Sequence, residues 1–564
     1  YSVSSNNSMY THDVSGTDST AENNTAYGFA AMDAITTGDH NVAIGKESLT
    51  ANTSGSSNIS IGVQANYGAD TESHNLSIGQ AALGSSVAGG EYNIAIGNFS
   101  LDAVNSGDQN TAVGYYAGSE TTTGSLNTFL GYQAGRDNTT ASDNVAIGAQ
   151  SMFNGTTTGN SNVAVGSNTL GVLTSGTRNI AVGYGASNAF DTENDNIAIG
   201  VNVLSGAVAG GEFNIGIGNF SLGALTSGDF NTAIGYISGS ALTTGSNNTS
   251  VGNQSLENHT IGNDNTAIGS GALNANTEGE QNTAIGRAAL GGNTTADNNT
   301  AVGYTALLAN TTGEHNIGIG NAAVNGCDTE NHNLGIGTDA LGGAVAGGEY
   351  NVAVGNYSLD AVTSGDNNTA VGYNAATTLS NGSANSSFGF EAGKGLTSGS
   401  NNTSIGYLAG QSHTTGSHCT NLGSGAQPSS NTTSGQFTLG DSNVSNLRCN
   451  DQSISALSDS RDKTDVIDSP YGLDFINTVR PVQFKWETRD GNVKDGSTRL
   501  GFLAQELLTA CDGNNAVFNL VLEDNPNKLE ATYGNLITPL VKAVQELSAT
   551  VTTLQQEINT LKGE

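Results

Sequence analysis

The chain has 564 residues, of which 78 are Gly and 5 are Pro, and its formal net charge is −34. Gly does not recur at every third position with Pro, which excludes collagen. No apolar run approaches the roughly 18 residues of a membrane-spanning helix, so we expect no membrane insertion. Only 16 Lys and Arg stand against 50 Asp and Glu. This deficit argues against nucleic acid as a partner, because such binding depends on neutralising phosphates.

Residues 1–23 precede the regular part of the sequence. They begin with Tyr1 rather than an initiator Met, so we expect a lead-in segment that is truncated at its start.

From residue 24 to residue 440 one short motif recurs: Asn, then Thr, Val or Ile, a small residue, Ile or Val, and Gly. Its glycine occurs 25 times between Gly28 and Gly440, and 20 of the 24 intervals are 17 residues long while four are 18. This period is too short for a pair of helices and suits one coil of a β-solenoid with two short strands and two turns. The sequence therefore predicts a mainly β chain with a parallel β-solenoid of about 24 coils over residues 24–440.

The repeat also predicts which side chains face the interior. The residue before the motif glycine is almost always Ile, Val or Leu, and we expect it to point into the coil. Leu, common four residues after the glycine, is expected to form a second inward column, and the motif glycine is expected at a corner with positive φ. Examples of the first column are Ile44, Ile61, Val113, Ile199 and Val354, and examples of the second are Leu49, Leu83, Leu101, Leu170, Leu256 and Leu359.

An Asn precedes the motif glycine by four residues in 23 of the 25 copies; Cys419 and Gln436 replace it in the last two. A column of this kind suggests either a ligand or ion array or a structural ladder. Stacked Asn side chains hydrogen-bond from coil to coil, and we favour this structural role. We expect no cofactor and no metal site, since the four cysteines (Cys327, Cys419, Cys449 and Cys511) lack zinc-ligand spacing.

The motif is similar to the head repeat of trimeric autotransporter adhesins of the YadA type, whose Asn-Ser-Val-Ala-Ile-Gly motif builds a parallel β-roll. The likeness covers residues 24–440 and implies a parallel β-roll, but it does not extend to an autotransporter as a whole. The family's repeats are shorter than 17 residues, and this chain shows no C-terminal membrane-barrel strands.

The composition changes after residue 440. Residues 458–564 hold 10 of the 16 Lys and Arg, four of the five Pro and the single Trp, Trp486. We expect a linker over residues 441–457 and a small α+β domain over residues 458–564.

Four segments of this domain resemble, in order, the intramolecular chaperone domain of endosialidases and phage tail fibres, the S74 peptidase family. They are Ser-Asp-Ser-Arg-Asp-Lys at 458–463, Arg-Pro-Val-Gln-Phe-Lys-Trp-Glu at 480–487, Gly-Phe-Leu-Ala-Gln-Glu-Leu at 501–507, and the segment 533–547. The resemblance implies a domain that trimerises, assists folding of the preceding β-fibre and cuts itself off between Leu457 and Ser458.

The implied reaction assigns roles to four residues. Ser458 would attack the Leu457 carbonyl to form an ester that water hydrolyses. A hydroxyl needs a base to become nucleophilic, and Lys463, if burial lowers its pKa, and Asp459 are competing candidates. Arg461 is expected either to pair with Asp459 or to stabilise the oxyanion.

The final segment predicts a coiled-coil helix over residues 535–562. Apolar residues repeat at 3,4 spacing over about four heptads. β-Branched residues at the first position with Leu at the second favour dimers in simple coiled coils, whereas the family resemblance implies a trimer, which we favour. The two columns are Ile537, Val544, Val551, Ile558 and Leu540, Leu547, Leu554, Leu561.

Together these features predict a homotrimeric virion tail fibre that attaches to a host-cell receptor, a glycan by hypothesis. Its only enzymatic activity would be single-turnover serine self-cleavage. One alternative is a bacterial adhesin at the cell surface with the same self-releasing domain. The other is a carbohydrate-binding or -degrading tailspike, although the acidic residues show no unique cluster of the kind that glycosidases need.

Overall fold

The computed structural model describes residues 2–3, 7–11, 20–85, 89–206, 210–343, 347–444, 447–448, 458–486, 496–523 and 529–563. The chain divides into two compact units, Tyr1–Tyr357 and Ser358–Glu564. Leu457 and much of the expected linker lie outside the described residues. The domain boundaries expected from the sequence stay predictions.

The first unit begins with an antiparallel pair, β1 (Ser2–Val3) and β2 (Met9–Tyr10), and continues as a stack of parallel strands. Each coil from β3 to β22 contributes one three-residue strand, paired with the strand of the next coil. The strands are β3 Thr25–Tyr27, β4 Val42–Ile44, β5 Ile59–Ile61, β6 Leu76–Ile78, β7 Ile94–Ile96, β8 Thr111–Val113, β9 Thr128–Leu130, β10 Val145–Ile147, β11 Val163–Val165, β12 Ile180–Val182, β13 Ile197–Ile199, β14 Ile215–Ile217, β15 Thr232–Ile234, β16 Thr249–Val251, β17 Thr266–Ile268, β18 Thr283–Ile285, β19 Thr300–Val302, β20 Ile317–Ile319, β21 Leu334–Ile336 and β22 Val352–Val354.

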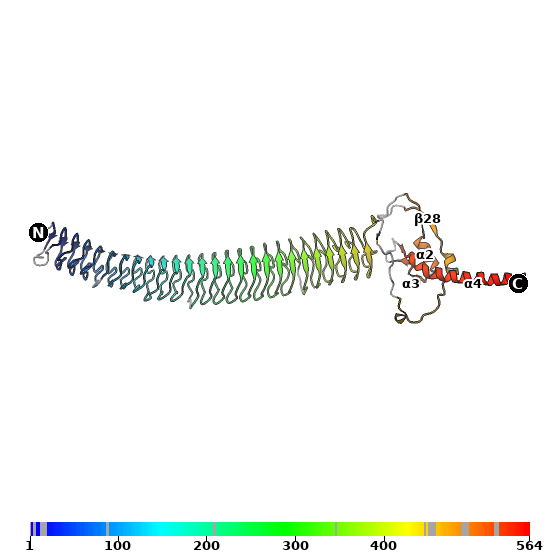
Figure 1. Cartoon of the computed structure of the whole chain (residues 1–564), viewed down its shortest axis with the longest axis horizontal. Coiled ribbons are helices and arrows are strands. Elements are labelled where there is room, and N and C mark those ends of the chain that lie inside the picture. Colours follow the sequence, from blue (N-terminus) through cyan, green and yellow to red (C-terminus); the bar gives the residue numbers. More distant parts are fainter. Residues whose placement is uncertain are drawn as a thin grey trace. The chain divides into compact units, whose positions relative to one another are not determined.

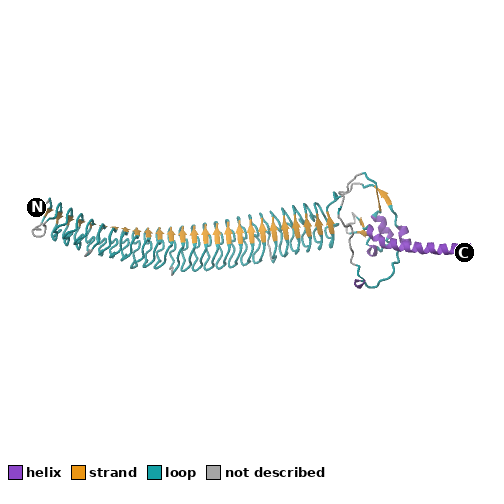
Figure 2. Ribbon diagram, in the orientation of Figure 1, coloured by secondary structure: helices purple, strands orange, loops and turns teal. Residues whose placement is uncertain are grey.

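The second unit opens with coils of the same kind. Its strands β23 (Thr369–Val371), β24 (Ser386–Phe388), β25 (Thr403–Ile405), β26 (Thr420–Leu422) and β27 (Phe437–Leu439) also pair in parallel. The predicted parallel β-solenoid is therefore confirmed. The expectation of two strands per coil was wrong: the described coils have one strand each, and turns make up the rest (Figure 2).

The interior of the coil is lined by small residues and one large one. The middle residue of every strand from β3 to β26 is buried, and it is most often Ala, as at Ala43. The predicted Leu column is also buried: Leu49, Leu83, Leu101, Leu170, Leu256 and Leu359 are at most 1% exposed. Leu occupies this position in 12 of the 25 copies of the motif and is the commonest large apolar residue there.

The inward orientation predicted for the residue before the motif glycine was wrong. Ile44 and Ile199 are each 39% exposed, and Ile61, Val113 and Val354 are only partly buried. Successive side chains of a strand point to opposite faces, so an inward Ala43 places Ile44 outside. Inward Ala allows the strand to lie close to the Leu column, and the larger aliphatic side chains are therefore on the outer face of the sheet.

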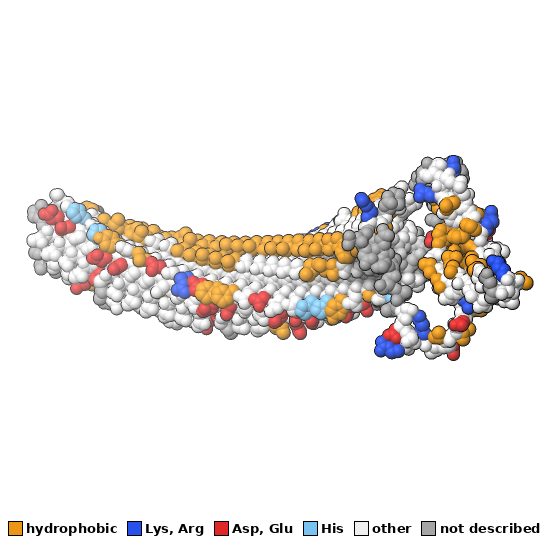
Figure 3. Space-filling model, turned by 45° about the vertical axis from the view of Figure 1, so that its right-hand side comes forward, with side chains coloured by type: hydrophobic (Ala, Val, Ile, Leu, Met, Phe, Trp, Pro, Cys, Tyr) orange, Lys and Arg blue, Asp and Glu red, His pale blue; other side chains and the backbone are white. Residues whose placement is uncertain are grey.

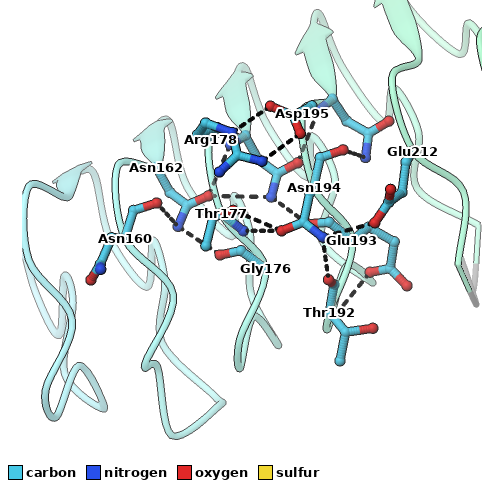
Figure 4. A network of polar contacts seen from close by, with 12 residues as sticks. Asn160, Asn162, Gly176, Thr177, Arg178, Thr192, Glu193, Asn194, Asp195 and Glu212 are labelled. Atoms are coloured by element: carbon cyan, nitrogen blue, oxygen red, sulfur yellow. Dashed lines mark hydrogen bonds and ion pairs between the residues drawn. The ribbon is translucent and has the colours of Figure 1, made fainter.

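The Asn column forms the predicted structural ladder. Along this column the Asn side-chain oxygen accepts a hydrogen bond from the backbone N–H of the next Asn, as from Asn41 to Asn24 at 2.8 Å. Its amide nitrogen donates to a turn carbonyl, as from Asn162 to Gly176 at 2.9 Å (Figure 4). The column is buried, and these bonds pair polar groups that would otherwise be costly to bury.

Neighbouring turns are joined by a second set of polar contacts. The Thr177 backbone N–H donates to the Asn194 side chain at 2.9 Å, and Arg178 pairs with Asp195 at 2.6 Å (Figure 4). The Arg178 side chain is exposed, so this ion pair adds little stability.

The motif glycines have the expected positive φ. Gly303 has φ +141, and a Cβ there would lie 2.2 Å from the Gly320 carbonyl oxygen of the next coil. Both the backbone conformation and the close coil-to-coil approach therefore require glycine.

The second unit also contains the predicted α+β domain (Figure 1). Its elements are η1 (Ser460–Asp462), α1 (Leu473–Thr478), β28 (Val482–Phe484), β29 (Arg499–Gly501), α2 (Ala504–Ala510), α3 (Asn515–Phe518), β30 (Val521–Leu522), β31 (Glu530–Ala531), η2 (Tyr533–Leu536) and α4 (Ile537–Lys562). A small core joins α1, α2, α3, β30 and η2, and it is formed by Phe475, Leu507, Cys511, Phe518, Leu520, Val521 and Leu536. Among the helices that the structure describes, none has the length and apolarity needed to cross a bilayer.

Replacing Gly303 with Ala is expected to destabilise the solenoid by about 3 kcal/mol or more, through backbone strain and the clash with the next coil. Gly271 provides the control, because its φ is +68 and nothing lies within 4 Å of a Cβ there. Gly271→Asn is expected to cost about 1 kcal/mol or less. Urea denaturation followed by circular dichroism measures both, and equal losses would contradict the close-approach argument.

His259 makes the stability of the solenoid depend on pH. It is buried, its Nε2–H donates to the Gly262 carbonyl at 2.8 Å, and its Nδ1 accepts from Asn276 at 3.1 Å. Burial lowers the pKa of His259, while the bond to Gly262 opposes the shift. Since the unfolded chain takes up the proton first, stability is full above about pH 6.5 and declines below it.

His259→Asn is expected to remove part of this decline, because the next three coils carry Asn at the equivalent position and bond in the same way. The exposed His418→Asn is the control. Thermal melts between pH 7.5 and pH 5 test the prediction, and an unchanged pH slope in the His259 variant would refute it.

Candidate functional site

The Ser-Asp-Ser-Arg-Asp-Lys motif forms one tight turn. Asp459 caps η1: its Oδ1 accepts the Arg461 backbone N–H at 2.9 Å, a role for which Asp is favoured. At the other end, the Lys463 backbone N–H bonds to the Ser460 carbonyl. The short 3₁₀ turn thereby brings the side chains of Ser458 and Lys463 to the same side of the turn.

Ser458 and Lys463 are in direct contact. The Lys463 Nζ donates to the Ser458 Oγ at 2.6 Å. A nucleophile and its base must lie within about 2.6–3.2 Å for proton transfer, so this distance suits the predicted chemistry. Residues 458–465 are all exposed in the single chain.

Asp459, the other candidate base, has a different partner. Its carboxylate binds the Arg461 guanidinium at 2.5 Å from Nη2 to Oδ2, and Arg461 Nε lies 3.0 Å from Oδ1. The side-chain hydrogen bond from Arg461 holds the pKa of Asp459 below its usual range, and the same contact raises the pKa of Arg461. The geometry thus separates two alternatives that the sequence leaves open: Lys463 contacts Ser458, while Arg461 pairs with Asp459.

The other motif segments meet elsewhere in the domain. Arg480 of the second segment forms an ion pair with Glu506 of the third, with Arg480 Nε 2.9 Å from Oε2. This contact lowers the pKa of Glu506 and raises that of Arg480. Glu506 therefore joins the second and third segments through this ion pair.

A pocket of about 600 Å³ lies between the same segments. Phe484 packs edge-on against Trp486, and Phe502 packs against Tyr533, whose hydroxyl donates to the Phe502 carbonyl at 3.2 Å. This pocket was not predicted from the sequence; the aromatic residues that the three segments contain were its only signal there. It is lined by Phe484, Lys485, Trp486, Phe502, Leu503, Ala504, Gln505, Leu529, Glu530, Ala531 and Tyr533.

A contact between α1 and α4 was also not predicted. The Leu473 backbone N–H, at the start of α1, donates to the Glu546 carboxylate at 2.7 Å. A Cβ at Gly472 would overlap this carboxylate, so Gly472 allows α4 to bind the end of α1. No local pattern in the sequence pairs residues 73 positions apart.

Within the described residues, no three His, Cys, Asp or Glu side chains gather in a group suited to a metal ion. Cys327, Cys419 and Cys511 are free and buried, and burial raises the pKa of Cys327 and Cys511. Cys449 lies outside the described residues.

Comparison with known proteins gives one match. Residues 458–517 match a family described as Peptidase S74, the chaperone of endosialidase. No curated protein and no solved structure matches the chain. The family match begins at Ser458, the residue that contacts Lys463.

Proposed function

We propose that the chain is a homotrimeric fibre protein whose C-terminal domain assembles and folds the solenoid and then cuts itself off between Leu457 and Ser458. The main support for this proposal is the distance of 2.6 Å between Lys463 Nζ and Ser458 Oγ. The match of residues 458–517 to the chaperone family supports it. The solenoid is the β-fibre that such a domain would assemble and fold.

In the proposed reaction, neutral Lys463 takes the proton from Ser458 Oγ, which attacks the Leu457 carbonyl carbon. The C–N bond breaks as the new C–O bond forms, and Lys463 returns the proton to the departing Ser458 nitrogen. Water then hydrolyses the ester, leaving a carboxylate on Leu457 and restoring the Ser458 hydroxyl.

The exposure of the site supports a role for assembly in this reaction. An amine acts as a base only when it is deprotonated, and removal from water favours the neutral form. Residues 458–465 are exposed in one chain. Cover by a neighbouring copy would bring Lys463 into the environment that the reaction needs, so that cleavage follows assembly.

Helix α4 supports self-association. All eight residues of its two heptad columns are exposed, including Val544 at 64% and Leu547 at 50%. Such a stripe on a 26-residue helix is typical of a coiled-coil seam without its partner. The proposed partners are two further copies of the same helix.

The proposed biological role is attachment of a virion to a receptor on the host cell, with a glycan as the proposed ligand class. The supporting features are the solenoid and the chaperone-type domain. An extracellular adhesin on a bacterial surface would use the same fibre and the same self-cleavage.

Cleavage can be tested by mass spectrometry of the purified full chain. The wild type is expected to yield a fragment ending at Leu457 and one beginning at Ser458, and Ser458→Ala is expected to stay intact. Lys463→Arg keeps a charged donor that does not deprotonate, so we expect cleavage to slow by roughly 100-fold or more.

Asp459→Asn is the matched control, because Asn also caps a helical turn and the carboxylate contacts Arg461 rather than Ser458. Most cleavage is expected to remain in this variant. Intact wild-type protein would refute the proposed reaction, and a block in Asp459→Asn with normal cleavage in Lys463→Arg would reverse the two roles.

Assembly through α4 can be tested by sedimentation equilibrium. Leu547→Asp places a carboxylate in the heptad seam and is expected to weaken the trimer strongly, because a buried unpaired charge is costly. Gln545→Asp adds the same charge to the same helix away from the seam. A trimer that survives Leu547→Asp, or a dimer in the wild type, would contradict the proposed assembly.

A further inference from the structure

Two places on the first unit carry the same pair of aromatic side chains at the surface. Phe99 follows the motif glycine after β7 by two residues, and Tyr115 directly follows the motif glycine after β8. Their ring centroids lie 6.2 Å apart, and the rings are inclined by 88°. Phe220 and Tyr236 form the same pair after β14 and β15, at 6.2 Å and 82°. Each pair is an aromatic corner: two nearly perpendicular rings from successive coils.

The aromatic corners belong to copies of one longer block of sequence. Residues 97–115 and 218–236 both begin with Gly-Asn-Phe-Ser-Leu and end with Gly-Tyr, and the copies start 121 residues apart. A third copy, residues 355–373, has Tyr in place of the Phe and ends in the same way. Only four of the 25 motif copies have an aromatic residue two positions after the glycine, and three of these open the blocks. The aromatic residues therefore recur as a set.

The coil itself does not need these rings. The backbone two positions after the motif glycine has a positive φ, which is 60 at Phe99 and 62 at Phe220. Gln254 and Gly271 hold the same position in other coils, with φ 57 and 68. A bulky aromatic residue is poorly suited to this conformation, and a ring at the surface adds little to the packing of the interior. Strain accepted without a gain in packing points to a function.

A fixed amide accompanies each aromatic corner. Asn98 lies directly before Phe99, and its Oδ1 accepts the backbone N–H of Gln80 at 2.9 Å. In the second corner Asn219 accepts the backbone N–H of Val201 at 3.0 Å. Both Asn side chains are exposed, and within the described part of the chain neither Nδ2 has an acceptor. The two amides are thus held in the same way, with N–H donors left for a ligand.

The charge of the chain limits the class of ligand. The net charge is −34, and Figure 3 shows Asp and Glu side chains along the drawn face of the coils, with few Lys or Arg among them. An anionic ligand would be repelled. The three side chains that the two corners share, an Asn, a Phe and a Tyr, are uncharged. Nothing in them pairs with an ionic group of either sign, which favours a neutral ligand.

A pyranose sugar has the matching chemistry. One face of its ring presents C–H groups, and its rim carries hydroxyls. The C–H face packs on an aromatic ring, while the hydroxyl oxygens accept hydrogen bonds from an amide. Perpendicular rings provide a floor and a wall for such a unit, and the neighbouring Asn provides the donors. Apolar surfaces with a few placed polar groups are typical of small-molecule sites.

We propose that the two aromatic corners, with Asn98 and Asn219, bind neutral sugar units of a polysaccharide. The corners are seven strands apart, or about 34 Å. A polysaccharide repeats its units, so one polymer can occupy both corners, and linked weak sites bind much more tightly than one. This inference rests on the proposed attachment to a glycan and adds the sites and the class of sugar.

An array of immobilised polysaccharides, neutral and acidic, tests the proposal with the purified full chain. We expect binding to at least one neutral polysaccharide. Tyr115→Ala and Tyr236→Ala in one chain remove one ring from each corner, and we expect this double variant to bind that polysaccharide about tenfold more weakly or worse. Circular dichroism checks that the solenoid is unchanged, as expected for exposed side chains.

Tyr184→Ala with Tyr304→Ala is the matched control. Both residues directly follow a motif glycine, and they are 57% and 50% exposed, against 44% for Tyr115 and 49% for Tyr236. The preceding coils have Asn168 and Ala288 where the corners have Phe, so these tyrosines stand outside a corner. The control variant is expected to bind as the wild type does.

Three results would overturn the proposal. One is binding to no neutral polysaccharide on the array, or to acidic ones alone. Another is an equal loss of binding in the two double variants. The third is a smaller assembly of the Tyr115→Ala, Tyr236→Ala chain in sedimentation, because the corners would then hold copies of the chain together.

The outcomes also separate this inference from the proposed function. Undiminished binding by the Tyr115→Ala, Tyr236→Ala chain would overturn the corners and leave attachment to a glycan standing. The uncut Ser458→Ala chain is expected to bind as the wild type does. Binding that depends on the corners therefore supports the inference whether or not the chain cuts itself.

Discussion

A column of buried Asn residues, one in nearly every coil, sets the spacing on which the rest of the structure depends, because both ends of each side-chain amide bond to the next coil. Its oxygen binds a backbone N–H of the next ladder residue and its nitrogen binds a turn carbonyl, as for Asn24 and Asn41. The fixed spacing from coil to coil aligns the Ala and Leu side chains in the interior. It also aligns each strand with the strand of the next coil. A ladder residue that failed to pair would leave buried polar groups unsatisfied, so each coil is stabilised by its neighbours.

Much of the fold could be predicted from the sequence because the same short motif occurs 25 times. Asn, Leu and Gly each have one physical reason for their position: a paired amide, a filled interior and a positive φ. The orientation of the aliphatic column could not be predicted in the same way, since large apolar residues are usually inside. The Ala in the middle of each strand was the contrary signal, because only one face of a three-residue strand can be inward.

The sequence indicated which residues belong to the candidate site, but it did not indicate which of them contacts Ser458. The motif contains two possible partners for Ser458, and spacing alone does not rank them. The η1 turn does, because Asp459 uses its carboxylate to cap the turn and bind Arg461, while Lys463 reaches the hydroxyl. The contacts of Arg480 with Glu506 and of Leu473 with Glu546 depend on tertiary folding, which no local pattern encodes.

The repeat builds the fibre, and the domain that follows it is proposed to assemble three copies of that fibre before it cuts itself off. Electron cryo-microscopy of the purified full chain tests this proposed assembly most directly. We predict particles that contain three solenoids. Particles with one or two solenoids would contradict the proposal.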